Sequence, residues 1–353
     1  MINSDVIFNQ LEKLDIKETK LSQPIFQSKR VLALIANLLC LFFVTFGSAY
    51  AQSDYPNRPV RIIVPYPAGG TTDAVTRLYA KELGDKFGHQ FVVENRPGGG
   101  TNVGAEAVAN SAPDGYTLFV VQAASHGVNP SLFKKLNYDA IKDFAPVGQM
   151  ARTAMFLIAN PKAPFNNMKE LVAYAKNNPG KLNYASQGNG SPGHLGGALL
   201  TLRTGVSLVH IPYKGAAQAL ADIASGETQI GFLSYDGVAK GLVKAGRLKV
   251  LAVAASDRWV NEPSIPSMAE SGLMDLQVLS FFGLSAPSKT PDIVLEKLSK
   301  MMLEIGARED IKQKVLDMGL SPLSMSRTEM GNFITAEIDY WRPVVKATGV
   351  TID

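Results

Sequence analysis

A short strand, a glycine turn and the start of a helix follow one another in residues 60–83, and this unit constrains the fold more than any other stretch. Its residues 62–64 (Ile-Ile-Val) are typical of a strand that is covered on both faces. Gly69-Gly70 then lets the backbone approach a ligand closely, and Thr72 or Asp73 is expected to cap the helix. Because free N–H groups and a positive dipole end favour an anion, the turn is a candidate carboxylate site. A purely structural turn is the alternative.

The same order of elements recurs in residues 182–202. A strand at 182–185 leads to a loop of small residues at 186–194, and Ser191 followed by Pro192 fits a helix cap and its first helical position. Strands alternate with helical segments along most of the chain, which predicts an α/β protein with parallel sheets. Ligands of such sheets bind beyond the carboxyl ends of the strands, so two such units predict a cleft.

Length and composition are those of a globular protein with about two domains. The chain has 353 residues, of which 46% are hydrophobic and 19% charged. Its net charge of +4 comes from scattered basic residues, so nucleic acid is not an expected partner. We predict one lobe from 52–155 plus 278–353 and a second lobe from 156–277, joined by two crossing strands that allow closure.

The first 51 residues are predicted to be a secretory signal peptide. A nearly continuous apolar run at 31–46 follows Lys29-Arg30 and precedes Ala49-Tyr50-Ala51, a small-residue cleavage site. The run is shorter than the roughly 20 residues of a membrane-spanning helix. Cleavage after Ala51 and a periplasmic location are therefore expected, while an uncleaved anchor and a start codon downstream of Met1 remain alternatives. The single cysteine, Cys40, lies in this segment, so no disulfide or thiol nucleophile is expected in the mature chain.

Common enzyme motifs fail in their details. The glycines of 98–104 are out of register for a dinucleotide fingerprint, and there is no phosphate-binding loop motif. Residues 189–193 approach the Gly-x-Ser-x-Gly motif, but Asn189 replaces the first glycine and Pro192 removes an oxyanion-hole N–H. We predict no enzymatic activity, no cofactor and no metal, since the four histidines have no metal-ligand spacing. The competing hypothesis is a serine hydrolase that uses Ser191 or Ser125 with His126 or His194.

Six ordered motifs carry a resemblance that covers 55–353. They are Pro65–Asp73, Glu94–Gly100, Asp114–Leu118, Asn178–Tyr184, His210–Gly215 and Pro263–Gly272. In this order the chain closely resembles the Bug family of extracytoplasmic solute receptors, the TctC-like binding subunits of tripartite tricarboxylate transporters. The resemblance implies a periplasmic binding protein of type II topology, whose two lobes close on a small carboxylate such as an organic acid or an amino acid.

The resemblance also implies a set of ligand-binding residues and partners. The first-strand loop would contribute Tyr66, Ala68, Gly70, Thr71, Thr72 and Asp73, the facing loop Gln187, Ser191 and His194, and further candidates are Ser125, Lys214, Gly215 and Asp236. The receptor is expected to be a monomer that delivers its ligand to TctA/TctB-like membrane subunits. A ligand-sensing receptor that acts on a signalling partner is the alternative. Asp73 is expected to organise the loop, with Lys214 as a possible counter-ion.

Overall fold

The computed structural model describes residues 55–213, 215–235 and 237–352. The chain separates into Met1–Tyr55 and Pro56–Asp353, and the description below concerns the second unit. The predicted signal peptide, Lys214 and Asp236 lie outside the described residues. None of the helices in the described ranges combines the length and the apolar character needed to cross a membrane.

The first half of the chain contributes most of one sheet and its helices. These elements are β1 (Val60–Val64), α3 (Thr71–Phe87), β2 (Phe91–Asn95), η1 (Gly99–Thr101), α4 (Asn102–Ala109), β3 (Thr117–Val121), η2 (Ala124–Val128), α5 (Asn129–Leu132) and β4 (Phe144–Ala154). After the second sheet, the chain returns to complete the first sheet with β10 (Leu279–Pro287), α10 (Asp292–Ala307), α11 (Glu309–Asp317), β11 (Ser321–Pro322) and α12 (Arg327–Thr348).

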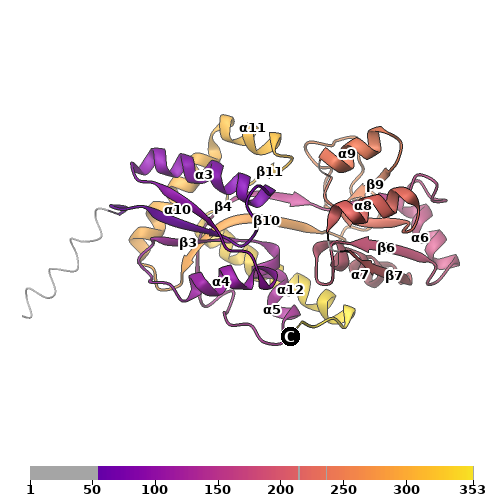
Figure 1. The fold of residues 1–353 in the computed structure, drawn as a ribbon, viewed down its shortest axis with the longest axis horizontal. Helices are drawn as coiled ribbons and strands as arrows, with labels where there is room; N and C mark the ends of the chain where they lie inside the picture. The colour runs from indigo at the N-terminus through magenta and orange to yellow at the C-terminus, as the bar shows by residue number, and fades with distance from the viewer. Residues whose placement is uncertain (1–54, 214, 236, 353) are drawn as a thin grey trace, which may run out of the picture. The chain divides into compact units, whose positions relative to one another are not determined.

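The second sheet is built from the middle of the chain. Its elements are β5 (Phe156–Ala159), α6 (Met168–Asn177), β6 (Leu182–Ser186), α7 (Pro192–Thr204), β7 (Leu208–Pro212), α8 (Ala216–Ser225), β8 (Ile230–Leu233), α9 (Gly237–Lys244) and β9 (Lys249–Val253). Figure 1 shows β10 returning from this sheet to the first one.

Each sheet is mixed rather than parallel. The strand orders are β11-β4-β10-β3-β1-β2 and β7-β6-β8-β5-β9. The predicted α/β fold with two sheets is confirmed, but the prediction of parallel sheets is wrong in one respect. β10 is antiparallel to both β3 and β4, and β5 is antiparallel to both β8 and β9. These two strands arrive directly from the other sheet, so local sequence patterns carry no signal for their direction. The two-residue strand β11 is likewise antiparallel to β4.

Backbone hydrogen bonds tie the two crossings together. Met155, between β4 and β5, donates its N–H to the carbonyl of Val278 (2.9 Å), just before β10. Ala254 donates to Met155 (2.8 Å) and accepts from Val278 (2.9 Å). The carboxyl ends of the parallel strands in each sheet therefore lie at the edge where the chain crosses. The exact boundaries of two mobile lobes stay a prediction.

Helices α10 and α12 pack on the two faces of the first sheet. A Cβ placed on Gly148 of β4 would meet Met302 of α10, whereas one on Gly283 of β10 would meet Met330 of α12. Both glycines therefore let a helix approach the sheet closely. On the face of α12, Phe119 and Phe281 belong to a buried apolar cluster.

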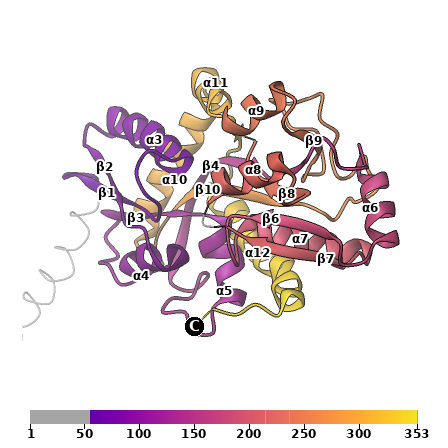
Figure 2. The ribbon, with the colours of Figure 1, turned by 45° about the vertical axis from the view of Figure 1, so that its right-hand side comes forward.

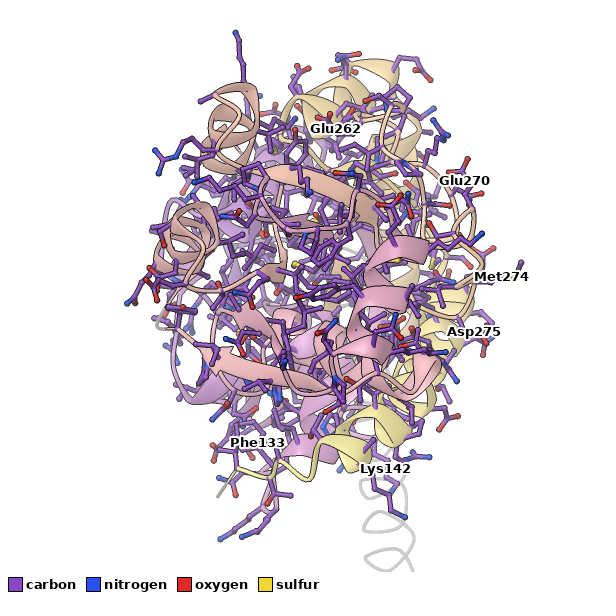
Figure 3. All side chains as sticks on the ribbon, turned by 90° about the vertical axis from the view of Figure 1, so that its right-hand side faces the viewer. Phe133, Lys142, Glu262, Glu270, Met274 and Asp275 are labelled. Carbon is purple, nitrogen blue, oxygen red and sulfur yellow. The ribbon has the colours of Figure 1, made fainter. Side chains whose placement is uncertain are left out.

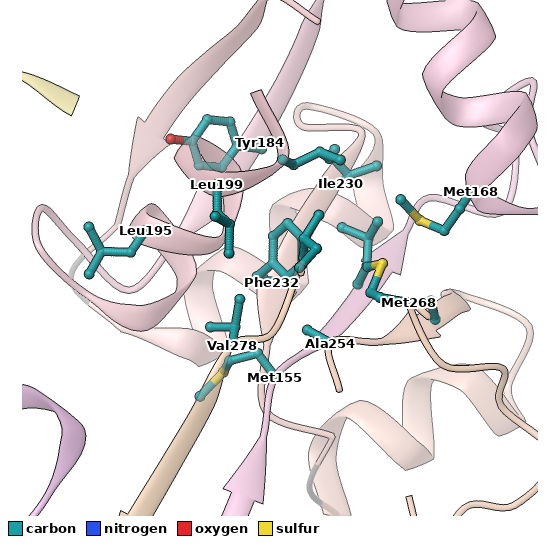
Figure 4. Packing of buried hydrophobic residues seen from close by; sticks show 14 of the residues in the cluster. Met155, Met168, Tyr184, Leu195, Leu199, Ile230, Phe232, Ala254, Met268 and Val278 are labelled. Carbon is teal, nitrogen blue, oxygen red and sulfur yellow. The ribbon is translucent and has the colours of Figure 1, made fainter. Parts of the chain in front are cut away.

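The second sheet buries both of its faces, and successive residues of its strands belong to different cores. Leu157 of β5 and Phe232 of β8 pack in one apolar cluster with α6 and α7, as Figure 4 shows for Phe232. Phe156 and Leu233, their neighbours along the chain, pack in the other cluster with α8 and α9. This explains why these strands read as continuous apolar runs.

Helix α12 packs into the cores of both sheets. Ile334 and Ile338 belong to the core of the first sheet, whereas Trp341 and Val345, one and two turns later, belong to a core of the second. Figures 1 and 2 show the C-terminal half of α12, in yellow, beside α7, which it contacts. A single helix therefore links the two sheets in addition to the crossing strands.

The approach of α7 to β6 depends on a glycine. A Cβ on Gly197 would overlap the ring of Tyr184, so we expect Gly197→Ala to lower the free energy of unfolding by about 1–3 kcal/mol. Gly241, in the exposed face of α9, has open space around it and is the matched control. Gly241→Ala should raise stability by up to about 1 kcal/mol through helix propensity. Urea unfolding measures both, and equal effects would contradict the packing argument.

Candidate functional site

A cavity of about 930 Å³ lies between the facing edges of the two sheets. The first sheet contributes Tyr66 and Gln122 from the loops after β1 and β3, together with Thr71 and Thr72 from the first turn of α3. The second contributes Gln187 and Ser191 from the loop after β6. Both predicted strand–loop–helix units therefore open onto one cavity, as ligand sites of open α/β sheets do.

Helix α3 begins at the wall of this cavity. Gly70 is the N-cap residue and no side chain caps the helix, so the prediction that Thr72 or Asp73 caps it is wrong. Thr71 and Thr72, in the first turn, line the cavity. The first N–H groups of the helix are therefore left for water or a ligand.

Asp73 stabilises the loop after β1 without lining the cavity. Its carboxylate accepts hydrogen bonds from the Gly69 N–H, the Arg77 side chain and the Asn95 amide (2.9–3.0 Å). Asn95 also donates to the Tyr66 carbonyl (3.0 Å), which ties β2 to the same loop. The hydrogen bond from Arg77 contributes most to lowering the pKa of Asp73 to about 2. Asp73 does not line the cavity, so its negative charge is neutralised away from the place where a ligand would lie.

A buried polar chain supports Thr72. Gln122 donates from its side-chain amide to the Thr72 hydroxyl (2.7 Å), and its backbone N–H donates to the Ser125 hydroxyl (3.2 Å). The Ser125 hydroxyl in turn lies 3.0 Å from His126 Nδ1. Both residues belong to η2, which is one turn of π-helix. Such turns often occur at functional sites. Sequence analysis missed Gln122, although its position directly after a buried strand was a usable signal.

The Ser125–His126 pair is not a hydrolase dyad. Both residues have 0% exposed surface, and burial lowers the pKa of His126 to about 3. His126 packs its ring against Phe144 and Phe119. A substrate cannot reach the Ser125 hydroxyl in this arrangement, so this pair is part of the core.

The loop after β6 presents the start of α7, and here the sequence prediction is confirmed. Ser191 is the N-cap residue, with Pro192 in the first turn. The Ser191 hydroxyl donates to the Gly188 carbonyl (2.7 Å) and accepts from the His194 N–H (3.3 Å). Gln187 lines the cavity with a side-chain oxygen that is buried without a hydrogen-bond partner among the described residues.

Two stacked histidines hold this loop. His194 Nδ1 accepts the Gly190 N–H (3.0 Å), and its ring stacks on that of His210 with centroids 4.0 Å apart. His210 Nε2 lies 2.7 Å from the Ser186 hydroxyl. Burial lowers the pKa of His194, while burial and the charge of His194 lower the pKa of His210 to about 4. His194 is 5% exposed and does not line the cavity, so it supports the loop.

The predicted residues thus fall into three groups. Those that line the cavity are Tyr66, Thr71, Thr72, Gln187 and Ser191. Those that do not line it are Ala68, Gly70, Asp73, Ser125, His194 and Gly215. Lys214 and Asp236 lie outside the described residues. Besides Gln122, sequence analysis missed a group at one end of the cavity that includes Tyr235, Lys240, Trp259 and Glu262.

This fold and this cavity define a class of protein: α/β solute receptors that bind a ligand between two sheets. The comparison with family models gives the family. The model of the tripartite tricarboxylate transporter family receptor, TctC, matches residues 75–350. The chain belongs to this family.

Known proteins agree with that assignment along nearly the whole chain. The protein BugT of Bordetella pertussis is 33% identical over 326 residues, which cover 92% of this chain and 98% of the relative. A structure of a protein of R. palustris with adipate has a TM-score of 0.72 and 32% identity, and covers 84% of this chain and 99% of its own. The structure of MatC from Rhodopseudomonas palustris with bound malate has a TM-score of 0.69 and 30% identity. The match covers 82% of this chain and 100% of MatC.

The stacked histidines predict acid sensitivity. Their pKa values are lowered in the folded protein, so between about pH 6.5 and pH 4 the unfolded chain binds protons that the folded one does not. Stability should therefore fall as the pH drops through this window. His210→Phe retains a ring for stacking but cannot be protonated. Its free energy of unfolding should therefore decrease less with falling pH than that of the wild type. Urea unfolding from pH 7 to pH 4 measures both curves. Parallel curves would contradict this role of His210.

Proposed function

We propose that this protein is a periplasmic receptor that captures a small carboxylate in the cavity between its two sheets. The observation that carries the proposal is that the N-termini of two helices, α3 and α7, open onto the same cavity. The start of α3 leaves N–H groups without a side-chain cap, whereas α7 begins with Pro192 and its His194 N–H donates to Ser191, so α7 contributes mainly its positive dipole end. The two together suit an anion better than a cation.

Thr72 is the side chain best placed to bind the carboxylate. Its hydroxyl oxygen accepts from Gln122, and no acceptor for its own proton is recorded among the described residues, so the proton is available to a ligand. Gln187 faces it from the other loop with an amide that can donate. Uncharged donors of this kind bind a carboxylate without the cost of burying an unpaired cation.

The similar solved structures support a carboxylate, since one is of an R. palustris protein with adipate and another is of MatC with bound malate. We further propose that the signal peptide ends at Ala51 and that TctA/TctB-like membrane subunits receive the ligand. Closure would bring the lobe of 52–155 and 278–353 against the lobe of 156–277. Tyr66, Thr71 and Ser191 would then surround the ligand with the two residues named above.

Calorimetry of the mature chain against acetate, malate, adipate, citrate and benzoate tests the proposal. We expect at least one of these acids to bind with a 1:1 stoichiometry. Thr72→Val removes the donor at nearly constant volume and should weaken that binding by about 1–3 kcal/mol, the usual effect of leaving a buried polar partner unsatisfied.

Thr335→Val is the matched control, because Thr335 is exposed on α12, bonds to the Gly331 carbonyl and does not line the cavity. It should leave affinity unchanged. Failure of every carboxylate to bind would overturn the proposed function. Equal affinity of the Thr72→Val variant and the wild type would remove Thr72 from the site.

A further inference from the structure

The cavity continues well beyond the two helix N-termini, into a part that we call the aromatic arm. Its residues are Phe156, Tyr235, Trp259, Lys240 and Glu262, and all of them line the same cavity as Thr72. Figure 3 labels Glu262 and Phe133, which line the cavity at places far apart in that view. The cavity therefore has room for more than a carboxylate group.

The strand order of the second sheet gives the distance from the carboxylate end to the arm. Gln187 follows β6, Tyr235 follows β8, Phe156 begins β5 and Trp259 follows β9, in the spatial order β6-β8-β5-β9. Neighbouring strands lie about 4.8 Å apart, so Tyr235 and Phe156 lie roughly one and two strand spacings from Gln187. A six-membered ring that carries a short carboxylate chain spans such a distance.

The walls of the arm are aromatic and held in place. The Phe156 and Tyr235 ring centroids are 5.1 Å apart at an interplanar angle of 40°. Phe156 and Trp259 are each 4% exposed, and the Trp259 indole donates to the Gly319 carbonyl (3.4 Å). Rings fixed in this way provide faces and edges against which another ring can pack.

An ion pair at the arm disfavours a second carboxylate. Lys240 Nζ lies 2.6 Å from Glu262, and it also lies 5.6 Å from the centroid of the Tyr235 ring. The side chain of Glu262 is only 20% exposed. A dicarboxylate whose far end lay here would have to displace Glu262 from Lys240 and leave that carboxylate unpaired, which is unfavourable for a largely buried group.

We propose that the aromatic arm holds the uncharged ring of an aryl monocarboxylate, whose carboxylate binds at the N-termini of α3 and α7. This inference rests on the proposed function and narrows its ligand class. Tyr235 is then a specificity-determining residue, because its ring faces the ligand body and not the carboxylate.

Calorimetry with 3-phenylpropanoate, hexanoate and adipate tests the inference. We expect 3-phenylpropanoate to bind at least fivefold more tightly than the other two acids. Tyr235→Leu keeps an apolar side chain but removes the ring face, and should weaken 3-phenylpropanoate about five- to tenfold while changing hexanoate less than twofold. Thermal unfolding of each variant shows that the fold is retained.

The double variant Lys240→Met, Glu262→Gln separates this inference from carboxylate binding at Lys240. In this variant we expect 3-phenylpropanoate still to bind more tightly than hexanoate, because the Tyr235 ring is retained, whereas a loss above tenfold for both acids would place the carboxylate at Lys240 and overturn the inference. Tighter binding of adipate, with a loss in Thr72→Val, would overturn the aromatic arm but leave the proposed function intact. Binding of no carboxylate at all would overturn both.

Discussion

Three backbone hydrogen bonds at the crossing of the chain determine where a ligand can lie. Met155, Ala254 and Val278 belong to segments that are distant in sequence, and each donates to or accepts from another of the three. Because β5 and β10 enter their sheets from this point, both run antiparallel to their neighbours. The carboxyl ends of β1, β3, β6 and β8 consequently face one cavity. If each sheet were formed without strands that cross from the other sheet, nothing would require the loops of the two sheets to face one cavity.

Electrostatics at the cavity follow from how the loop charges are paired. Asp73 would repel an anion if it faced the cavity, but its bonds to Arg77, Asn95 and Gly69 hold it behind the loop. The anion-binding groups that remain are the backbone N–H donors at the start of α3, whose orientation the helix fixes before a ligand arrives, and the Thr72 hydroxyl, whose oxygen Gln122 holds in place. Fixed dipoles do not have to reorganise when a ligand binds. They can bind the carboxylate group whatever the chemistry of the rest of the ligand.

Much of the fold and part of the site could be predicted from the sequence, for physical reasons that differ between residues. The strand–loop–helix units were readable because β-branched runs, Gly69-Gly70 and the Ser191-Pro192 pair have strong local preferences. Gln122 was missed because its role depends on a bond to Thr72, fifty residues away in sequence. Local sequence likewise does not distinguish a histidine that faces a cavity from one that supports a loop, as His194 does through Gly190. The aromatic arm, whose residues come from three separate segments, has no local pattern at all.

The two sides of the cavity are held together by different interactions. On one side, α12 buries Trp341 and Val345 in the core of the second sheet, and uncovering each such side chain costs about 1.5–3 kcal/mol. On the other side, the side chains of Trp259 and Asn261 donate to the carbonyls of Gly319, just after α11, and Leu316, in its last turn, and each such bond contributes about 0.5–1.5 kcal/mol. Trp259 is also 4% exposed, so this side combines these hydrogen bonds with the burial of an indole ring. The segment 259–262 therefore both joins α11 through these bonds and lines the aromatic arm, so the shape of the arm depends on the same contacts that connect the two sheets here.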